Sequence, residues 1–449
     1  MRVKPIRFIH FAAFGMIALT LGACSRGQAT SAPRSAPPPP PPAVSLPSDA
    51  AAAEETIRFL ENKVKRDPEE FIALNKLAGY YLQHVRETGD VTYLNLASRA
   101  AQASLATLPP EQNTGGLTAL AQIRYASHDF IAARDYAKRL TELEPRKSYP
   151  FQILGDVMLE LGEYDKAEAA FRRMEQFGGI QGLTQVAIEQ RSARLAALHG
   201  DIDSARRSLS RALNLALKLP VPPRETVAWC YWQLGETAFA AGDYATAEQH
   251  YRDSLVTFPD YFRALASLGR ALAARGDTAG AIEQYKRAVQ RLPDPSFVAA
   301  LGDLFALKGR QKDAAAQYAL VEQIGRLSAL NGVLYNRQLA LFHADHDLKA
   351  DEAYASARKE YEVRRDIYGA DALAWTALKT GKIREAQAAI KEAPRLGTRD
   401  ARFFYHAGMI ARAAGDKVSA RNYLEHALTL SPQFDPLQAS IARKALEKL

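Results

Sequence analysis

The sequence lacks the residue patterns by which most catalytic sites are recognised. Its 449 residues include two cysteines and nine histidines, but no GxSxG, no HExxH, no phosphate-binding loop and no closely spaced pair of cysteines. A glycine-rich stretch at 178–182 lacks the Lys-Ser/Thr that follows a phosphate loop, so we interpret it as a connecting loop. We therefore expect neither an enzymatic activity nor a cofactor.

A strong excess of one charge is missing as well. Charged residues make up 24% of the chain and hydrophobic residues 47%, which is typical of a soluble globular protein. Of the formal net charge of +8, three units come from Arg2, Lys4 and Arg7, and the remaining excess is dispersed along the chain. Nucleic-acid-binding proteins concentrate their basic residues in a patch or stripe, so we expect no nucleic-acid partner.

The N-terminal segment 1–23 has no acidic residue and no apolar run long enough to cross a membrane. Its basic residues precede the apolar run Phe8–Leu21, which is shorter than the roughly 20 residues that a spanning helix needs. A basic head followed by a short apolar run predicts an export signal.

The residues that end this run, LGACS at 21–25, resemble the lipobox of bacterial lipoprotein signal peptides. The resemblance implies cleavage before Cys24, lipid on its sulfur and acylation of the new N-terminus, and Ser25 favours the periplasmic side of a Gram-negative outer membrane. The inner membrane and the cell surface are alternatives for the anchor. An ordinary secretory signal or an uncleaved anchor are alternatives to lipidation. With Cys24 lipidated, Cys230 has no partner in the chain, and we predict a small buried side chain there.

A linker is predicted at residues 24–53. Its unbroken proline run, Pro37–Pro42, has no backbone donors and favours the extended polyproline II conformation. We interpret the linker as a stiff spacer that holds the folded body away from the membrane. The alternative is a docking strip for a partner that recognises proline.

From Glu54 onward the sequence repeats a helical pattern. A large apolar residue is followed three and four residues later by Leu-Gly, ending at Gly155, Gly235, Gly269 and Gly302. Further glycines follow, often before an acidic residue, which indicates a helix end and a helix start: Gly162, Gly242, Gly276 and Gly309. An alanine then recurs every 33 to 42 residues, with a large apolar side chain four residues later at Phe171, Leu209, Tyr251, Tyr285, Tyr318 and Leu424.

This pattern resembles the tetratricopeptide repeat, which has a period of 34 residues. The resemblance implies an all-α fold, a right-handed superhelical α-solenoid of about ten helix-turn-helix repeats spanning residues 54–432, with a capping helix at 433–449. Glycine and alanine would let the two helices of a repeat approach closely, and the large apolar residues would lock neighbouring repeats together.

The same resemblance implies a concave groove lined by the first helix of each repeat, beside the packing positions. Aromatic and arginine side chains on this stripe suit recognition of an extended peptide. Packing of these rings between repeats is the alternative, notably for the three tryptophans. The predicted groove residues are Tyr149, Asp156, Arg194, Trp229, Trp232, Glu236, Phe239, Arg263, Arg270, Asp303, Tyr368, Asp371, Trp375, Arg402 and Tyr405.

Together these features predict a lipid-anchored scaffold that binds a protein or peptide partner during assembly or maintenance of the cell envelope. Two alternatives remain from the sequence. One is a metal-dependent enzyme that uses the histidines and aspartates of His343–Asp347. The other is a structural spacer without a specific ligand.

Overall fold

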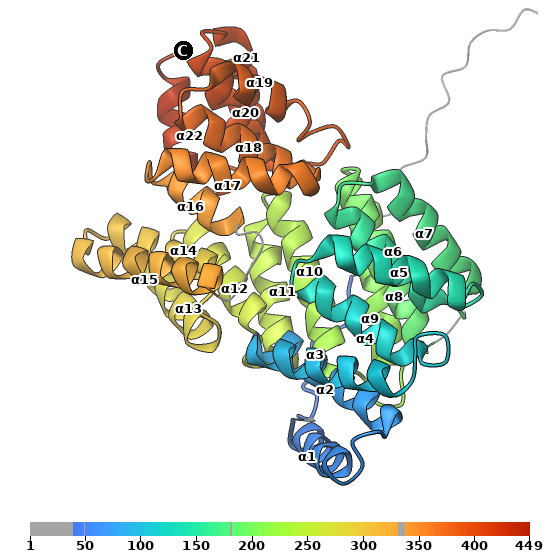
Figure 1. The fold of residues 1–449 in the computed structure, drawn as a ribbon. Helices are drawn as coiled ribbons and strands as arrows, with labels where there is room; N and C mark the ends of the chain where they lie inside the picture. The colour runs from blue at the N-terminus through green and yellow to red at the C-terminus, as the bar shows by residue number, and fades with distance from the viewer. Residues whose placement is uncertain (1–38, 49, 180–181, 331–336) are drawn as a thin grey trace, which may run out of the picture. The chain divides into compact units, whose positions relative to one another are not determined.

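The computed structural model describes residues 39–48, 50–179, 182–330 and 337–449, and every regular element among them is a helix. Twenty of these helices form ten successive pairs joined by short turns (Figure 1). The predicted all-α repeat solenoid is therefore confirmed. Cys24 and the first part of the linker lie outside the described residues.

We call the first helix of each pair helix A, the second helix B, and number the pairs as repeats 1 to 10. The pairs are α2 (Phe71–Thr88) with α3 (Thr92–Thr107), α4 (Thr114–Ala126) with α5 (Phe130–Leu143), α6 (Ser148–Glu160) with α7 (Tyr164–Phe177), α8 (Gly182–Leu198) with α9 (Ile202–Leu217), α10 (Arg224–Ala240) with α11 (Tyr244–Thr257), α12 (Phe262–Ala274) with α13 (Thr278–Arg291), α14 (Pro295–Leu307) with α15 (Gln311–Leu330), α16 (Arg337–Asp345) with α17 (Ala350–Val363), α18 (Ile367–Lys379) with α19 (Ile383–Ile390), and α20 (Ala401–Ala413) with α21 (Lys417–Leu430).

A single helix flanks the pairs at each end. Helix α1 (Ala50–Arg66) packs Ile57 and Leu60 against the first repeat, and α22 (Gln438–Leu446) packs against the last. Helix α1 begins inside the segment predicted as linker, because the run Ala50–Ala53 consists of the residue with the highest helix propensity. None of the helices that the structure describes is both long enough and apolar enough to span a membrane.

The turn between helix A and helix B contains a residue with positive φ in every repeat. Glycine occupies this position in eight repeats, and His128 and Asp347 occupy it in the other two, with φ of 60° and 53°. An aspartate directly after the turn caps helix B in repeats 2, 4, 5, 6 and 10: Asp243, for example, accepts a hydrogen bond from the backbone N–H of Thr246 at 3.1 Å. Glu163, at the same position in repeat 3, makes no such bond. The predicted stop-and-start signal is confirmed.

Helix B approaches helix A so closely that a ring lies directly on a glycine. A Cβ added to Gly155 would lie within 2.6 Å of two atoms of the Phe171 ring, and one added to Gly235 would lie within 2.6 Å of two atoms of the Tyr251 ring. These distances are below any van der Waals contact, so no larger residue fits without displacement of the ring. The same approach recurs between Gly269 and Tyr285, Gly302 and Tyr318, and Gly408 and Leu424.

Repeats that are five apart in the sequence also contact each other. The A–B turn of repeat 3 meets the loop after α17, where the Arg365 N–H donates to the Leu161 carbonyl at 3.2 Å. A Cβ at Gly162, in that turn, would overlap the Arg365 carbonyl. The turn of repeat 4 meets the loop after α19 in the same way, since the Thr398 hydroxyl donates to the Leu198 carbonyl.

The contact recurs along the solenoid with the same offset of five. In repeat 5 the Ser431 hydroxyl, from the loop after α21, donates to the Phe239 carbonyl at 3.4 Å. In repeat 1, Gly89 lies against Leu292, in the loop after α13. The superhelix therefore completes one turn in about five repeats, and successive turns lie on each other.

The glycine under a ring can be tested against a matched glycine in another helix A. Gly235→Ala should lower the free energy of unfolding by about 1–3 kcal/mol, because the new methyl group displaces the Tyr251 ring. Gly79→Ala is the control: Gly79 lies in α2 with no atom within 4 Å of the added Cβ, so this variant should be about 0.5–1 kcal/mol more stable. Urea unfolding followed by circular dichroism measures both. Equal shifts in the two variants would contradict the close approach.

Candidate functional site

The predicted groove residues lie on helices A, where most of them pair with a residue about one repeat away. The separations between paired residues are mostly 34 or 35 positions. Such a pair joins equivalent positions on neighbouring helices A. The inward-facing stripe is therefore a series of polar contacts between repeats, and the side chains form three groups.

The first group joins α10 to α12. Glu236 accepts hydrogen bonds from Arg270 at 2.7 Å on both oxygens, from the Tyr251 hydroxyl at 2.7 Å and from the Ser267 hydroxyl at 2.8 Å. Trp232 donates its indole N–H to the Ser267 oxygen at 2.9 Å. The carboxylate thus holds three side chains of two repeats in one arrangement, and Trp232 joins them through Ser267.

Electrostatics stabilise the charged form of Glu236. Burial by itself raises the pKa of this carboxyl group, but the Arg270 guanidinium and the donated hydrogen bonds outweigh burial and hold the pKa below its usual value. The Arg270 guanidinium also lies 4.0 Å from the ring centroid of Phe239, which is buried. Both charges of this pair therefore have a partner across the repeat boundary.

Trp229 and Arg263 form the accessible edge of this group. Trp229 is half-buried, with its ring centroid 6.4 Å from that of Trp232. Arg263 is exposed, and its guanidinium lies 5.6 Å from the Trp232 ring and 5.0 Å from the Phe262 ring. An exposed guanidinium over two rings is an arrangement typical of binding hot spots.

The second group joins α6 to α8. Arg191 binds Asp156 through two nitrogens, at 3.2 and 2.6 Å, and Arg194 binds Glu160 at 2.6 Å. Arg364, which follows α17, also binds Glu160 at 2.6 Å, so this carboxylate joins repeats five apart. Burial raises the pKa of Glu160, but the two guanidinium groups outweigh it and the net pKa is lowered. Tyr149, at the start of α6, is half-buried against the core of repeats 2 and 3.

The third group joins α16, α18 and α20 and is almost fully enclosed. Trp375 is 2% exposed, donates its indole N–H to Asp345 at 2.7 Å and stacks on His406 at a centroid distance of 4.2 Å. Asp371 binds His406 at 2.8 Å, and Tyr405 is 2% exposed. Of the two alternatives for the tryptophans, packing between repeats therefore describes Trp375. The Tyr405 and Asp371 side chains are equally inaccessible to a partner.

The remaining predicted residues occupy separate places. Asp303 accepts hydrogen bonds from the Tyr318 hydroxyl and His346, each at 2.7 Å. Tyr368 is 43% exposed and rests on Phe403. Arg402 is half-buried, and its charge interacts most strongly with Asp400, followed by Asp435 and Asp345.

A polar hollow crosses three successive helices A next to the first two groups. Its lining includes Gln152 of α6, Gln190 and Arg191 of α8, and Thr226 of α10. Thr226 lies one helical turn before Trp229 on the same face of α10. Amide and hydroxyl side chains of this kind pair with the backbone of an extended peptide. The hollow and the Trp229–Arg263 edge therefore form the accessible candidate site, which we call the helix-A hollow.

The side chains of the His343–Asp347 cluster point to different partners. His343 contacts Glu322 at 2.7 Å, His346 contacts Asp303, and Asp347 contacts Lys379 at 2.7 Å. Asp345 contacts Trp375 and Gln438. Within the described part of the chain, no three His, Cys, Asp or Glu residues gather as a metal site would require.

Cys230 is buried and free, as predicted. Burial raises the pKa of its thiol to about 12, so the reactive thiolate is scarce near neutral pH.

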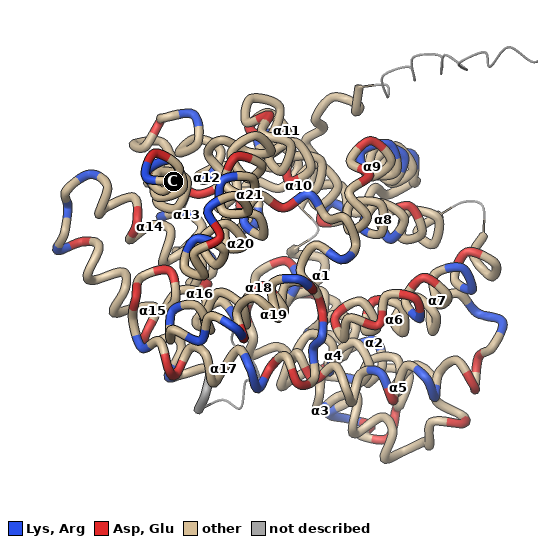
Figure 2. The backbone as a smooth tube through the Cα atoms, turned by 90° about the horizontal axis from the view of Figure 1, so that it is seen from above, with Lys and Arg blue, Asp and Glu red and all other residues tan. Residues whose placement is uncertain are grey.

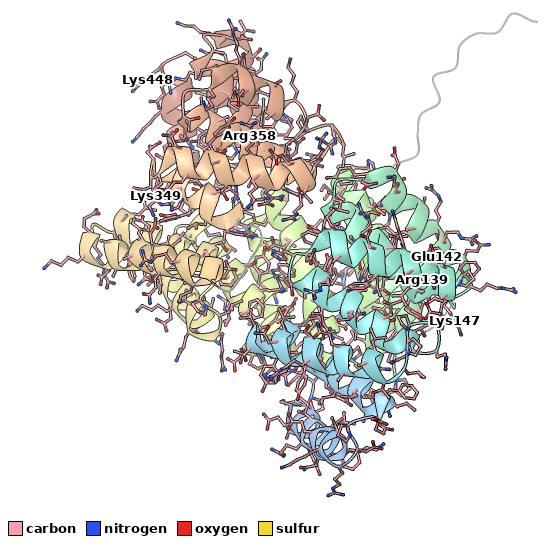
Figure 3. The ribbon with its side chains drawn as sticks, viewed as in Figure 1. Arg139, Glu142, Lys147, Lys349, Arg358 and Lys448 are labelled. Atoms are coloured by element: carbon pink, nitrogen blue, oxygen red, sulfur yellow. The ribbon has the colours of Figure 1, made fainter. Side chains whose placement is uncertain are left out.

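The outer face of the solenoid differs from the inner stripe. Figure 2 shows basic and acidic residues interspersed along the helices. Ion pairs there are exposed, such as Arg139 with Glu142 on α5 at 2.9 Å (Figure 3). Exposed pairs of this kind contribute little to stability.

Sequence reasoning missed several partners of the inner stripe: Glu160, Arg191, Ser267, Asp345, His346 and His406. For some of these residues, the spacing of charges in the sequence could have indicated the partner. An acidic residue on one helix A is followed 34 or 35 positions later by a basic residue, as with Glu236 and Arg270. This signal does not find the pair Asp303–His346, because these two residues are 43 positions apart in the sequence.

Comparison with known proteins matches the chain to models of the tetratricopeptide repeat. One model matches residues 186–255, and a second matches residues 118–179, 233–296 and 372–433. Together these segments cover slightly more than half of the chain. A TPR repeat-containing protein of Bacillus subtilis (strain 168), YpiA, is 22% identical over 316 residues, which is 70% of this chain. The match spans 63% of that relative's length, less than two thirds.

Solved structures to which the chain is similar include three with low sequence identity. A tetratricopeptide repeat protein from Parabacteroides merdae is 17% identical, with 59% of this chain and 98% of that chain covered and a TM-score of 0.32. The type IV pilus biogenesis factor PilW is 17% identical, with coverage of 50% and 94% and a TM-score of 0.38. The Cut9-Hcn1 complex of the APC/C is 13% identical, with coverage of 89% and 94% and a TM-score of 0.32.

The inner ion pair Glu236–Arg270 should contribute more to stability than an outer pair between repeats. Arg270→Met leaves the partly buried Glu236 carboxylate without its counter-charge, and we expect a loss of about 1–3 kcal/mol of unfolding free energy. Arg291→Met is the matched control: Arg291 pairs with Asp260 across a repeat boundary, but both side chains are about half exposed, so stability should change little. Urea unfolding measures both variants. Adding Glu236→Gln to Arg270→Met should restore part of the loss, and failure to do so would count against an unpaired carboxylate as its cause.

Proposed function

Because the chain belongs to the tetratricopeptide repeat family, we propose that it is a scaffold that binds a protein partner, held at a membrane by a lipid on Cys24. Its work is the assembly or maintenance of the bacterial cell envelope. Partner binding is the general use of such repeats. The membrane anchor and the envelope role rest on the LGACS sequence at residues 21–25.

The observation that carries the binding role is the helix-A hollow. Three successive helices A contribute Gln152, Gln190 and Thr226 to its lining. The Asp156–Arg191 ion pair fixes α6 to α8, the Gln190 amide contacts the Cys230 sulfur of α10 at 3.7 Å, and the bonds of Trp232 and Glu236 fix α10 to α12. A surface held in one arrangement before binding loses little conformational entropy when a ligand arrives. The hollow is therefore preorganised for an extended segment.

The side chains at the edge of the hollow indicate which side chains the partner would present to them. Arg263 is exposed over Trp232, and its charge also interacts with Glu225, the neighbour of Thr226. An exposed guanidinium beside rings and amides suits a peptide that carries an acidic side chain next to an apolar one. We expect the partner to present such a pair to Arg263 and Trp229.

A photo-crosslinking amino acid at Thr226 in the full chain, expressed in its native host, tests the binding site. It should capture a defined partner, identified by mass spectrometry, and Arg263→Glu should reduce that product at least fivefold through charge repulsion. Arg358→Glu is the control, because Arg358 lies on the outer face of α17 (Figure 3). Thermal melting should be nearly unchanged in both variants. A product that is equally strong in both, or absent altogether, would favour the spacer without a specific ligand.

The anchor has a separate test in Cys24→Ser. This variant should move from the membrane pellet to the soluble fraction and lose metabolic labelling with a palmitate analogue, since each buried CH₂ contributes about 0.8 kcal/mol to membrane binding. Cys230→Ser removes the other cysteine, which is buried in α10, and should stay in the pellet with full labelling. Continued labelling of the Cys24→Ser chain would rule out lipidation at this residue.

A further inference from the structure

Residues 39–48 of the predicted linker lie against the solenoid. Pro40, Ala43 and Leu46 are half-buried, as is Pro41, whereas Pro39, Pro42, Val44 and Ser45 are exposed. Burial with a period of three is the pattern of a polyproline II helix that rests one face on a surface, because that helix has three residues per turn. The spacer interpretation therefore does not describe this part of the linker, which we call the proline strip (residues 39–47).

Two buried hydroxyl groups bind the backbone of the proline strip. The Tyr231 hydroxyl donates to the Pro41 carbonyl at 3.1 Å and to the Pro42 carbonyl at 2.8 Å. The Thr257 hydroxyl donates to the Val44 carbonyl at 2.9 Å. Tyr231 and Thr257 are fully buried. Without the strip, both hydroxyls would lose these acceptors.

The end of the strip adds an apolar anchor. Leu46 packs against the core cluster that includes Leu213 of α9 and Val227 of α10. The strip is thus held by hydrogen bonds over Pro41–Val44 and by the half-buried side chain of Leu46. Its surroundings match its chemistry: a proline run offers carbonyls but no N–H groups, and the solenoid supplies donors and an apolar surface.

The stacking of repeats that are five apart explains why the strip lies where it does on the solenoid. The loops after helix B of repeats 6, 8, 9 and 10 are covered by the A–B turns of repeats 1, 3, 4 and 5. Among the described residues, the single helix α1 precedes repeat 1, so no A–B turn lies at the place where a turn would cover the loop after helix B of repeat 5. The proline strip lies at the end of that helix B, where Thr257 binds it.

We propose that α10 and α11 form a binding site for a polyproline II segment, and that its ligand is the chain's own proline strip. The site is distinct from the helix-A hollow. Thr226 lines the hollow and Trp232 reaches Ser267 on α12, whereas Tyr231 lies on another face of α10 and binds the strip. The strip completes the covered edge of the solenoid and fixes the linker to repeat 5. This proposal does not depend on lipidation or on the partner.

The test uses the full chain with residues 39–47 replaced by a Gly/Ser sequence of equal length. A fluorescent peptide of residues 36–48 should bind this chain saturably in an anisotropy titration. Tyr231→Phe and Thr257→Val, each added to the replaced chain, should weaken binding about fivefold per lost hydrogen bond. The unmodified chain should bind the peptide at least about 100-fold more weakly, because its tethered strip is present at a millimolar effective concentration.

Controls separate docking from unfolding and from exchange between molecules. Circular dichroism should show an unchanged helix content in each variant, and a peptide with Pro39–Pro42 replaced by alanine should bind more weakly. A folded, strip-replaced chain that does not bind the peptide would overturn the proposal. A peptide affinity that stays the same in both hydroxyl variants would also overturn it. A concentration-dependent dimer of the unmodified chain would do so as well, because the strip would then bind to a second copy of the chain.

A second measurement leaves the strip in place. A nitroxide attached at Ser45→Cys, which is exposed, should be immobilised in the otherwise unmodified chain. Tyr231→Phe with Thr257→Val should make it mobile in the electron paramagnetic resonance spectrum. An unchanged spectrum in the double variant would also reject the site, and both substitutions are conservative enough to keep the helices folded.

Discussion

Contact between repeats five positions apart determines how tightly the solenoid winds. It requires a turn without a side chain, because the Arg365 carbonyl occupies the space that a Cβ of Gly162 would take. It also requires a close and uniform approach of helix A to helix B, which the rings of Phe171 and Tyr251 achieve by resting on Gly155 and Gly235. A looser pair would change the rotation per repeat, and errors of that kind add up over five repeats.

Tight winding brings the inward-facing stripe together, and this explains why its charges are paired. A guanidinium or carboxylate that faces a narrow interior loses water and needs a partner. The Glu160 carboxylate has two such partners, Arg194 from the next repeat and Arg364 from five repeats later. The stripe is accessible at the hollow across α6, α8 and α10 and at the exposed edge at Arg263, and this is why we propose that a partner binds there.

The sequence predicts the parts of this fold that depend on neighbouring residues. The Leu-Gly step, the turn glycines and the ring four residues after each alanine are local signals, and the pairs Gly235–Tyr251 and Gly269–Tyr285 follow from them. His128 and Asp347 take the place of glycine in two turns and carry no such signal. Contacts at an offset of five arise from small rotations summed over several repeats, which no local pattern records. Trp375 and Tyr405 therefore lie on the predicted stripe, but the local pattern leaves open whether such a ring lines a groove or packs between repeats, and both are enclosed.

Helix α10 shows how one element can serve two separate surfaces. Successive side chains on a helix point about 100° apart, so Trp232 reaches Ser267 on α12 while its neighbour Tyr231 reaches the carbonyls of Pro41 and Pro42. Cys230, between the aromatic residues, is fully buried and fills the core between these surfaces. A strip that binds Tyr231 therefore leaves the hollow open. The linker and a partner can be held by the same repeat at the same time, and the strip steadies the helix that carries Trp229 and Thr226.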